Sequence, residues 1–118
     1  MALRIYTYKN CDTCRKALKF LDAHNIQYTN IPIREQPPTK AELKKMLGYL
    51  DGELKRLFNT SGMDYRSMNL KDTLPTMTTK EAIELLNKNG NLVKRPFILG
   101  ATTGTVGFKK EDWRELFK

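Results

Sequence analysis

The alternation of apolar and polar positions predicts how the chain begins. The run from Leu3 to Tyr8 alternates and is rich in β-branched and aromatic residues, which is typical of a strand. From Asp12 to about Ala23, apolar residues recur at helical spacing and form one face. That face consists of Cys14, Ala17, Leu18 and Leu21. A second strand is predicted from Gln27 to Ile33, which makes a βαβ unit with parallel strands and a right-handed crossover.

Two helix starts are predicted in the middle of the chain. Thr39 with Glu42, and Thr78 with Glu81, match the capping box, in which a hydroxyl and a carboxylate three residues later each bind the other's backbone N–H. Apolar residues at helical spacing follow both boxes. A short helical turn is expected around Leu57.

The boundaries between these helices are less regular. The pattern leaves Met63 to Met68 open between irregular and helical structure. The segment from Leu70 to Met77 contains a proline and is predicted to be a connector. Gly90 is expected to stop the second capped helix.

The last quarter of the chain predicts a hairpin followed by a helix. Val93 to Leu99 is a strand candidate, and Thr105 to Phe108 returns as its partner after a glycine-bounded turn. Lys109 to Phe117 is predicted to be a helix with Trp113 facing inward, together with Leu116 and Phe117. The whole chain, residues 1–118, is therefore expected to be a single α/β domain with a mixed sheet, ordered βαβ, a helical insertion at about 39–90, and ββα.

Both cysteines of the chain lie at the first strand-to-helix junction, two residues apart. Cys11 precedes the helix, where unpaired backbone N–H groups and the helix dipole favour a thiolate and lower a thiol pKa from about 8.5 to roughly 3.5–7.5. Cys14 faces partly inward, which suits a resolving thiol. A loop this short gains little from a structural disulfide. His24 is the chain's one histidine and is expected to be a surface residue at the helix end, so a zinc site is not expected.

Composition narrows the class of protein. The 118 residues carry a formal net charge of +8, but basic and acidic residues are interspersed on the predicted helix faces. We therefore expect a solvated surface rather than direct binding of nucleic acid. No apolar stretch approaches the roughly 18 residues of a membrane span. The expectation is a cytosolic protein, where a disulfide is usually catalytic or redox-sensing.

Motifs from one end of the chain to the other carry a resemblance to a known family. They comprise the residues 8–17 around the cysteines, the run from Leu57 to Gly62, the Tyr65-Arg66 pair, the run from Leu70 to Asp72, Arg95-Pro96 with the apolar run after it, and 106–108 with 113–117. Together they resemble the arsenate-reductase-like family, which includes the Spx-type redox regulators and has the thioredoxin-like fold.

The resemblance implies roles for individual residues. Cys11 matches the nucleophile, Arg95 matches an arginine that holds an oxyanion, and Pro96 matches a cis-proline facing the thiols. Two further arginines of the arsenate reductases fall near Asn59 and near Gly107-Phe108, where this chain has none. Lys109 or Arg66 could substitute in space. Bidentate arginines recognise a tetrahedral oxyanion, so their loss disfavours arsenate as the substrate.

Three polar residues around the cysteines are candidate ligands of a substrate. Asn10 and Thr13 could donate hydrogen bonds to sulfur or to a bound anion, or serve only the loop and the helix cap. Arg15 could steady the thiolate or be solvated.

Three functions follow from these residues. The first is a cytosolic thiol–disulfide oxidoreductase with Cys11 attacking and Cys14 resolving. The second is a glutaredoxin-dependent arsenate reductase. The third is a redox-sensing regulator that binds the RNA polymerase α subunit, for which the Asp51-Gly52 turn falls at a matching position. No bound cofactor is expected. Glutathione is the candidate reductant, with glutaredoxin or thioredoxin as protein partners, and the protein is expected to be a monomer.

Overall fold

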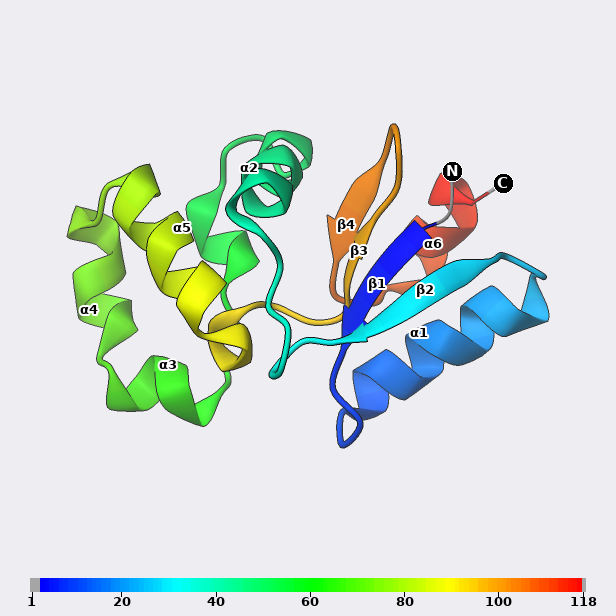
Figure 1. Cartoon of the computed structure of the whole chain (residues 1–118), viewed down its shortest axis with the longest axis horizontal. Helices are drawn as coiled ribbons and strands as arrows, with labels where there is room; N and C mark the ends of the chain where they lie inside the picture. Colours follow the sequence, from blue (N-terminus) through cyan, green and yellow to red (C-terminus); the bar gives the residue numbers. More distant parts are fainter. Residues whose placement is uncertain (1–2, 118) are drawn as a thin grey trace.

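The strand that precedes the cysteines is the centre of a four-stranded mixed sheet. The computed structural model describes residues 3–117 and gives the strand order β2-β1-β3-β4 (Figure 1). β1 (Leu3–Thr7) pairs in parallel with β2 (Tyr28–Pro32) and antiparallel with β3 (Phe97–Leu99), and β3 pairs antiparallel with β4 (Gly104–Val106). The predicted parallel pair, the hairpin and the mixed α/β sheet are confirmed.

The third strand is shorter than the sequence pattern predicts. Val93 forms only an isolated antiparallel bridge with Phe58, and β3 begins at Phe97. Pro96 explains the interruption, because a proline has no N–H to donate to a sheet ladder. The Arg95–Pro96 bond is cis, as the family resemblance implies.

The alternation of side chains along the strands divides the core between the two faces of the sheet. Ile5 and Ile98 point to one face, where α1 (Asp12–Ala23) and α6 (Lys110–Leu116) cover them with Leu21 and Trp113. Tyr6 and Phe97 point to the other face, where they pack with residues of the helices between β2 and β3. The sheet is therefore buried on both faces.

The helical layer contains more helix than the sequence predicts. Its elements are α2 (Lys40–Tyr49), the 3-10 turn η1 (Leu54–Leu57), α3 (Met63–Ser67), α4 (Leu70–Thr73), the 3-10 turn η2 (Leu74–Thr76), α5 (Thr79–Lys88) and the 3-10 turn η3 (Gly90–Leu92). The prediction of a connector at Leu70 to Met77 is wrong. Leu70 and Leu74 are buried, and the proline lies in the first turn of η2, where its missing N–H is not needed.

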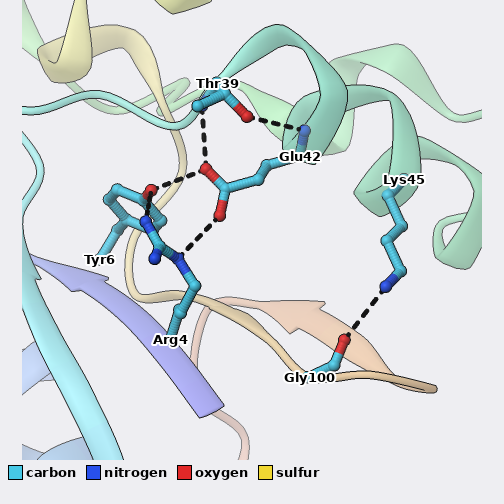
Figure 2. Close-up of polar contacts among 6 residues, drawn as sticks. All are labelled: Arg4, Tyr6, Thr39, Glu42, Lys45 and Gly100. Atoms are coloured by element: carbon cyan, nitrogen blue, oxygen red, sulfur yellow. Dashed lines mark hydrogen bonds and ion pairs between the residues drawn. The ribbon is translucent and has the colours of Figure 1, made fainter. Parts of the chain in front are cut away.

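Both capping boxes are confirmed, and the first one also fastens α2 to β1. Glu42 and Thr39 exchange the two capping hydrogen bonds. Glu42 Oε1 also accepts from the Tyr6 hydroxyl at 2.7 Å, and Oε2 accepts from Arg4 Nε at 3.0 Å (Figure 2). Partial burial opposes ionisation, but the Thr39 backbone, Tyr6 and Arg4 together hold the pKa of Glu42 below its usual value. One carboxylate thus caps a helix and binds the central strand.

A second contact binds the middle of α2 to the hairpin. Lys45 Nζ donates to the carbonyl oxygen of Gly100 at 3.3 Å, in the turn between β3 and β4 (Figure 2). It also donates to the carbonyl oxygen of Ala101 at 3.1 Å. α2 is therefore bound to both the central strand and the hairpin.

Gly90 follows the end of the second capped helix, as predicted, and has a further role. α5 ends at Lys88 with Asn89 as its C-cap, and Gly90 then starts a 3-10 turn. A Cβ atom at position 90 would stand 1.8 Å from the carbonyl oxygen of Ile33. Glycine is required here because two backbone segments are in contact.

We expect Glu42→Gln to destabilise the protein by about 1–2 kcal/mol at neutral pH, because it weakens the cap and the bonds to Tyr6 and Arg4. A carboxylate with a lowered folded pKa stabilises fully above its unfolded pKa, about 4.3, and loses this contribution as the pH falls through the folded value. The difference between wild type and variant should therefore shrink in acid. Urea unfolding measured across pH tests this.

Glu81→Gln is the matched control, since Glu81 makes the same capping box without bonds to another element. An equal loss of stability in the two variants would contradict the role assigned to Glu42 in fastening α2.

We expect Gly90→Ala to destabilise the protein by about 3 kcal/mol or more, because the added methyl group meets backbone that cannot move aside cheaply. Gly48→Ala serves as the comparison, since nothing lies within 4 Å of that Cβ position in α2. It should stabilise by about 0.5–1 kcal/mol. Thermal unfolding of both variants shows whether each one is more or less stable than wild type. A Gly90→Ala variant as stable as wild type would refute the assigned contact.

Candidate functional site

Cys11 is the N-cap of α1. Its backbone is extended, with φ −106° and ψ 114°, and its Sγ accepts the backbone N–H of Cys14 at 3.3 Å. The N–H of Cys11 itself donates to the carbonyl of Tyr8 at 3.1 Å, which closes the turn after β1. The sulfur is partly exposed and takes the place that a serine or aspartate oxygen usually holds at a helix start. An N–H donor and the positive end of the helix dipole both favour a negative charge on this sulfur.

Cys14 lies one turn further and is buried, with 1% of its surface exposed. Burial, together with the neighbouring Cys11, raises the pKa of the Cys14 thiol to about 12, although Tyr8 and Arg95 act in the opposite direction. Both thiols are free. The two sulfurs are therefore unequal, because one is exposed at a helix cap and the other is a buried, protonated thiol.

Arg15 is held by the loop that carries Cys11. Its Nη1 pairs with the carboxylate of Asp12, and its Nη2 donates to the carbonyl of Lys9 at 3.0 Å. The guanidinium thus links the first residue of α1 to the turn that precedes Cys11. Arg15 and Cys14 also line a small cavity of ≈ 340 Å³ on this side of α1.

Tyr8 forms a platform for two arginines next to the cysteines. The guanidinium carbons of Arg34 and Arg95 lie 4.9 and 5.0 Å from the centre of its ring. Its hydroxyl accepts from Asn10 Nδ2 at 3.3 Å and from Arg34 Nη1 at 2.8 Å. These two hydrogen bonds, with the charges of Arg34 and Lys9, hold the pKa of Tyr8 below its usual value. Asn10 therefore points to Tyr8.

Arg95 and Thr13 line one large cavity of ≈ 890 Å³. Arg95 Nη1 is buried and has no hydrogen-bond partner among the described residues. The following residue, Pro96, is buried, and its carbonyl accepts the N–H of Gly107 at 2.8 Å. The guanidinium of Arg95 puts a positive charge on the wall of the cavity, which suits an anionic ligand.

Of the two candidates for the missing arginines, one reaches this cavity. Lys109 lines it with Arg95, whereas Arg66 donates to the carbonyl of Ser61 and is not among the lining residues. Asn59 bonds the backbone of Leu92 and Asn91 instead of presenting a charge. Arg56 also lines the cavity, paired at 3.6 Å with Glu53.

Two arginines near Tyr8 and Arg95, Arg34 and Arg56, are not part of the predicted site, and the sequence contains a usable signal for only the first. Arg34 directly follows the predicted second strand, and parallel pairing brings the carboxyl end of that strand beside Tyr8. Arg56 lies in the short helical turn after α2. Nothing in its spacing shows that this turn faces Arg95, because the long helical insertion sets that approach.

The described part of the chain offers no metal site and no membrane helix. Among residues 3–117 there is no group of three His, Cys, Asp or Glu side chains arranged to hold a metal ion. No helix in the same range has the length and apolar character needed to cross a bilayer. His24 caps the end of α1 and is exposed, as expected.

Known proteins share both the sequence and the fold. The family model described as "ArsC family" matches residues 6–116. The chain is 46% identical over 115 residues to the uncharacterized protein YusI of Bacillus subtilis, covering 98% of each chain. It is 29% identical to the global transcriptional regulator Spx of Listeria innocua, over 93% of this chain and 82% of that one. A crystal structure of a putative ArsC family related protein from Bacteroides fragilis has 44% identity, a TM-score of 0.92, and 98% coverage of both chains. The resemblance seen in the sequence is confirmed, and the chain belongs to the ArsC family.

Proposed function

We propose that the protein is a thiol–disulfide oxidoreductase in which Cys11 attacks and Cys14 resolves. One observation carries the proposal: Cys11 Sγ is partly exposed and accepts an N–H at the start of α1, while Cys14 is buried directly behind it. The exposed sulfur is favoured as a thiolate by the helix start, and the thiolate is the nucleophile in disulfide exchange.

The reaction divides into two displacements. The Cys11 thiolate forms a bond to one sulfur of a substrate disulfide, and the other sulfur leaves as a thiolate that takes up a proton. Cys14 then loses its proton and attacks Cys11 Sγ, which releases the second substrate thiol and leaves the Cys11–Cys14 disulfide. The substrate gains two electrons and the protein loses two.

The raised pKa of Cys14 supports its role in the second step. A thiol with a pKa of about 12 stays protonated at neutral pH, so it does not compete with Cys11 for the substrate. It becomes a nucleophile only when the mixed disulfide changes its surroundings. Glutathione or thioredoxin then supplies the two electrons that restore the dithiol. Such a couple suits the reducing cytosol, where we place the protein.

Arg95 completes the site by orienting an anionic group next to the sulfurs. Its Nη1 has no partner in the described structure, and its charge favours ionisation of the nearby Cys14 thiol. Asn10, Thr13, Arg15 and Pro96 would then shape the approach to Cys11, with Arg15 holding the loop through Asp12 and Lys9.

Replacing the cysteines one at a time should separate the two steps. We expect Cys11→Ser to reduce turnover of insulin or glutathione disulfide to the uncatalysed background, because the nucleophile is gone. Cys14→Ser should keep the first step and accumulate a mixed disulfide, which mass spectrometry of the intact protein detects. The control is Lys19→Ser, which changes an exposed residue of the same helix that takes part in neither step.

Two results would remove this assignment. Turnover that survives in Cys11→Ser would show that another group attacks. Rapid mixed-disulfide formation at Cys14 in that variant would show that the buried thiol is the nucleophile.

A second candidate function is redox-controlled regulation, and the similarity to the Listeria regulator Spx favours it. The Asp51-Gly52 turn is exposed, with φ of +58° and +77°, and is available to a partner. If the protein is a regulator, the purified RNA polymerase α subunit should retain it on a column, and retention should differ between the dithiol and disulfide forms. A Gly52→Arg variant is the control for the turn, and absence of retention in both redox states rejects this function.

Reduction of arsenate has weaker support. Asn59 and Gly107 stand where arsenate reductases carry arginines, and Asn59 is bonded to backbone. The cavity holds Arg56 and Lys109 with Arg95, but Arg56 is paired with Glu53 and a lysine cannot form a bidentate fork.

A further inference from the structure

We propose that the large cavity beside Arg95 binds an extended, acidic polypeptide segment along the free edge of β4. The substrate of the thiols would then be a protein rather than a small disulfide. This deepens the proposed function, and rests on it only for the reaction of the peptide's sulfur with Cys11. Three properties of the cavity support it: its charge, its open strand edge and its position.

The charge of the cavity is strongly unbalanced. Five cationic side chains line it, against two carboxylates; the cations are Lys55, Arg56, Lys94, Arg95 and Lys109. Arg56 is paired with Glu53, but Arg95 Nη1 has no partner in the described structure. An acidic segment would balance this excess of positive charge.

The wall of the cavity includes an open strand edge. β4 is the last strand of the sheet, and Thr105 and Val106 line the cavity. In an antiparallel pair, hydrogen-bonded and non-hydrogen-bonded positions alternate. The bond from the Gly107 N–H to the Pro96 carbonyl makes position 107 a bonded position. Val106, opposite Phe97, is therefore a non-bonded position, with its N–H and C=O directed away from β3.

Those outward groups are what an added strand would bind. An extended peptide can pair with an exposed sheet edge through its main chain, while its side chains meet pockets on alternate sides. Here the half-buried Leu54 and Phe108 give apolar surface next to Val106. Lys94 lies along the same edge, since its Cε would be 3.4 Å from a Cβ at Gly107.

The cavity extends to the first turn of α1, and neither cysteine is among its lining residues. Thr13 lines it from the first turn of α1, two positions after Cys11, and Arg95 lines it next to the cis-proline. A segment lying along β4 towards Thr13 would bring a following disulfide to Cys11. The volume of ≈ 890 Å³ accommodates several residues of extended chain.

Binding is tested without any thiol reaction by using cysteine-free probes. A short fluorescent peptide of alternating Glu and Val is titrated with the reduced wild-type protein, and anisotropy gives the affinity. The Lys94→Glu/Lys109→Glu variant should bind at least about tenfold more weakly, because it reverses two charges of the cavity. Lys44→Glu/Lys80→Glu changes the net charge equally outside the cavity and should leave the affinity unchanged.

The strand pairing has its own readout. Two versions of the same peptide are N-methylated at every second residue, one at the odd positions and one at the even positions. In each version, the backbone N–H groups along one edge of the extended peptide are replaced and cannot donate hydrogen bonds. One of the two methylated peptides should bind and the other should not. In the bound protein, the Val106 amide should gain protection from hydrogen exchange, whereas the Thr105 amide, already bonded to β3, should not change.

The contrary results distinguish a failure of this proposal from a failure of the proposed oxidoreductase. Equal binding of both methylated peptides would show that no strand is added. Equal losses in the two charge-reversal variants, or equally tight binding of a single-stranded oligonucleotide of the same charge, would show a non-specific response to net charge. Peptide binding with no disulfide exchange would refute only the proposed oxidoreductase. Exchange with no peptide binding would refute only this inference.

Discussion

The position of β1 at the centre of the sheet is the constraint on which the site depends. β1 is paired on both edges, and its alternate residues Ile5 and Tyr6 are buried in the two separate clusters of the core. The strand therefore cannot shift its register by one residue without exchanging its core side chains between the two faces. The chain that leaves its carboxyl end turns at once, through the bond from the Cys11 N–H to the Tyr8 carbonyl, into α1. The place of Cys11 at the start of α1 is thus fixed by the packing of a strand that contains no reactive group.

The elements whose patterns are local could be read from the sequence, and those set by distant packing could not. The capping residues Thr39 and Glu42 identify the start of α2 because a helix start is satisfied by neighbours in sequence. The cysteine pair likewise identifies an exposed thiol and a buried one, since helical spacing alone separates them. The segment from Leu70 to Thr76 could not be predicted in this way. Its proline indicates a connector, but the segment is helical because Leu70 and Leu74 are buried in the core of the insertion. The contact of Gly90 with Ile33 joins segments far apart in the chain, and no local pattern contains it.

The same distinction explains the charges of the site. The sequence indicates Arg95 through its proline neighbour, but the Tyr8 ring that carries it also carries Arg34, which comes from the end of β2. Two guanidinium groups on one aromatic ring repel each other unless an anion or a negative ring face lies between them. The face of the Tyr8 ring therefore stabilises two guanidinium groups that would otherwise repel each other at this distance. Asn59 and Gly107 carry no charge, and the positive charge near Tyr8 and in the cavity is provided by Arg34 after β2, by Arg56 of the insertion and by Lys109 before α6.

The shortness of β4 has a consequence for the behaviour of the protein at high concentration. An exposed sheet edge is a template for pairing with other chains, and long, flat, apolar edges lead to aggregation. In this protein the edge is only three residues long. The Tyr49 ring and Met46 pack closely against Gly104 at one end, and Gly107 turns the chain away at the other with φ of +72°. Lysines flank what is left, so two copies of the molecule that met edge to edge would bring like charges together. The fold thus keeps one strand edge accessible to a short partner while discouraging the sheets of separate molecules from joining.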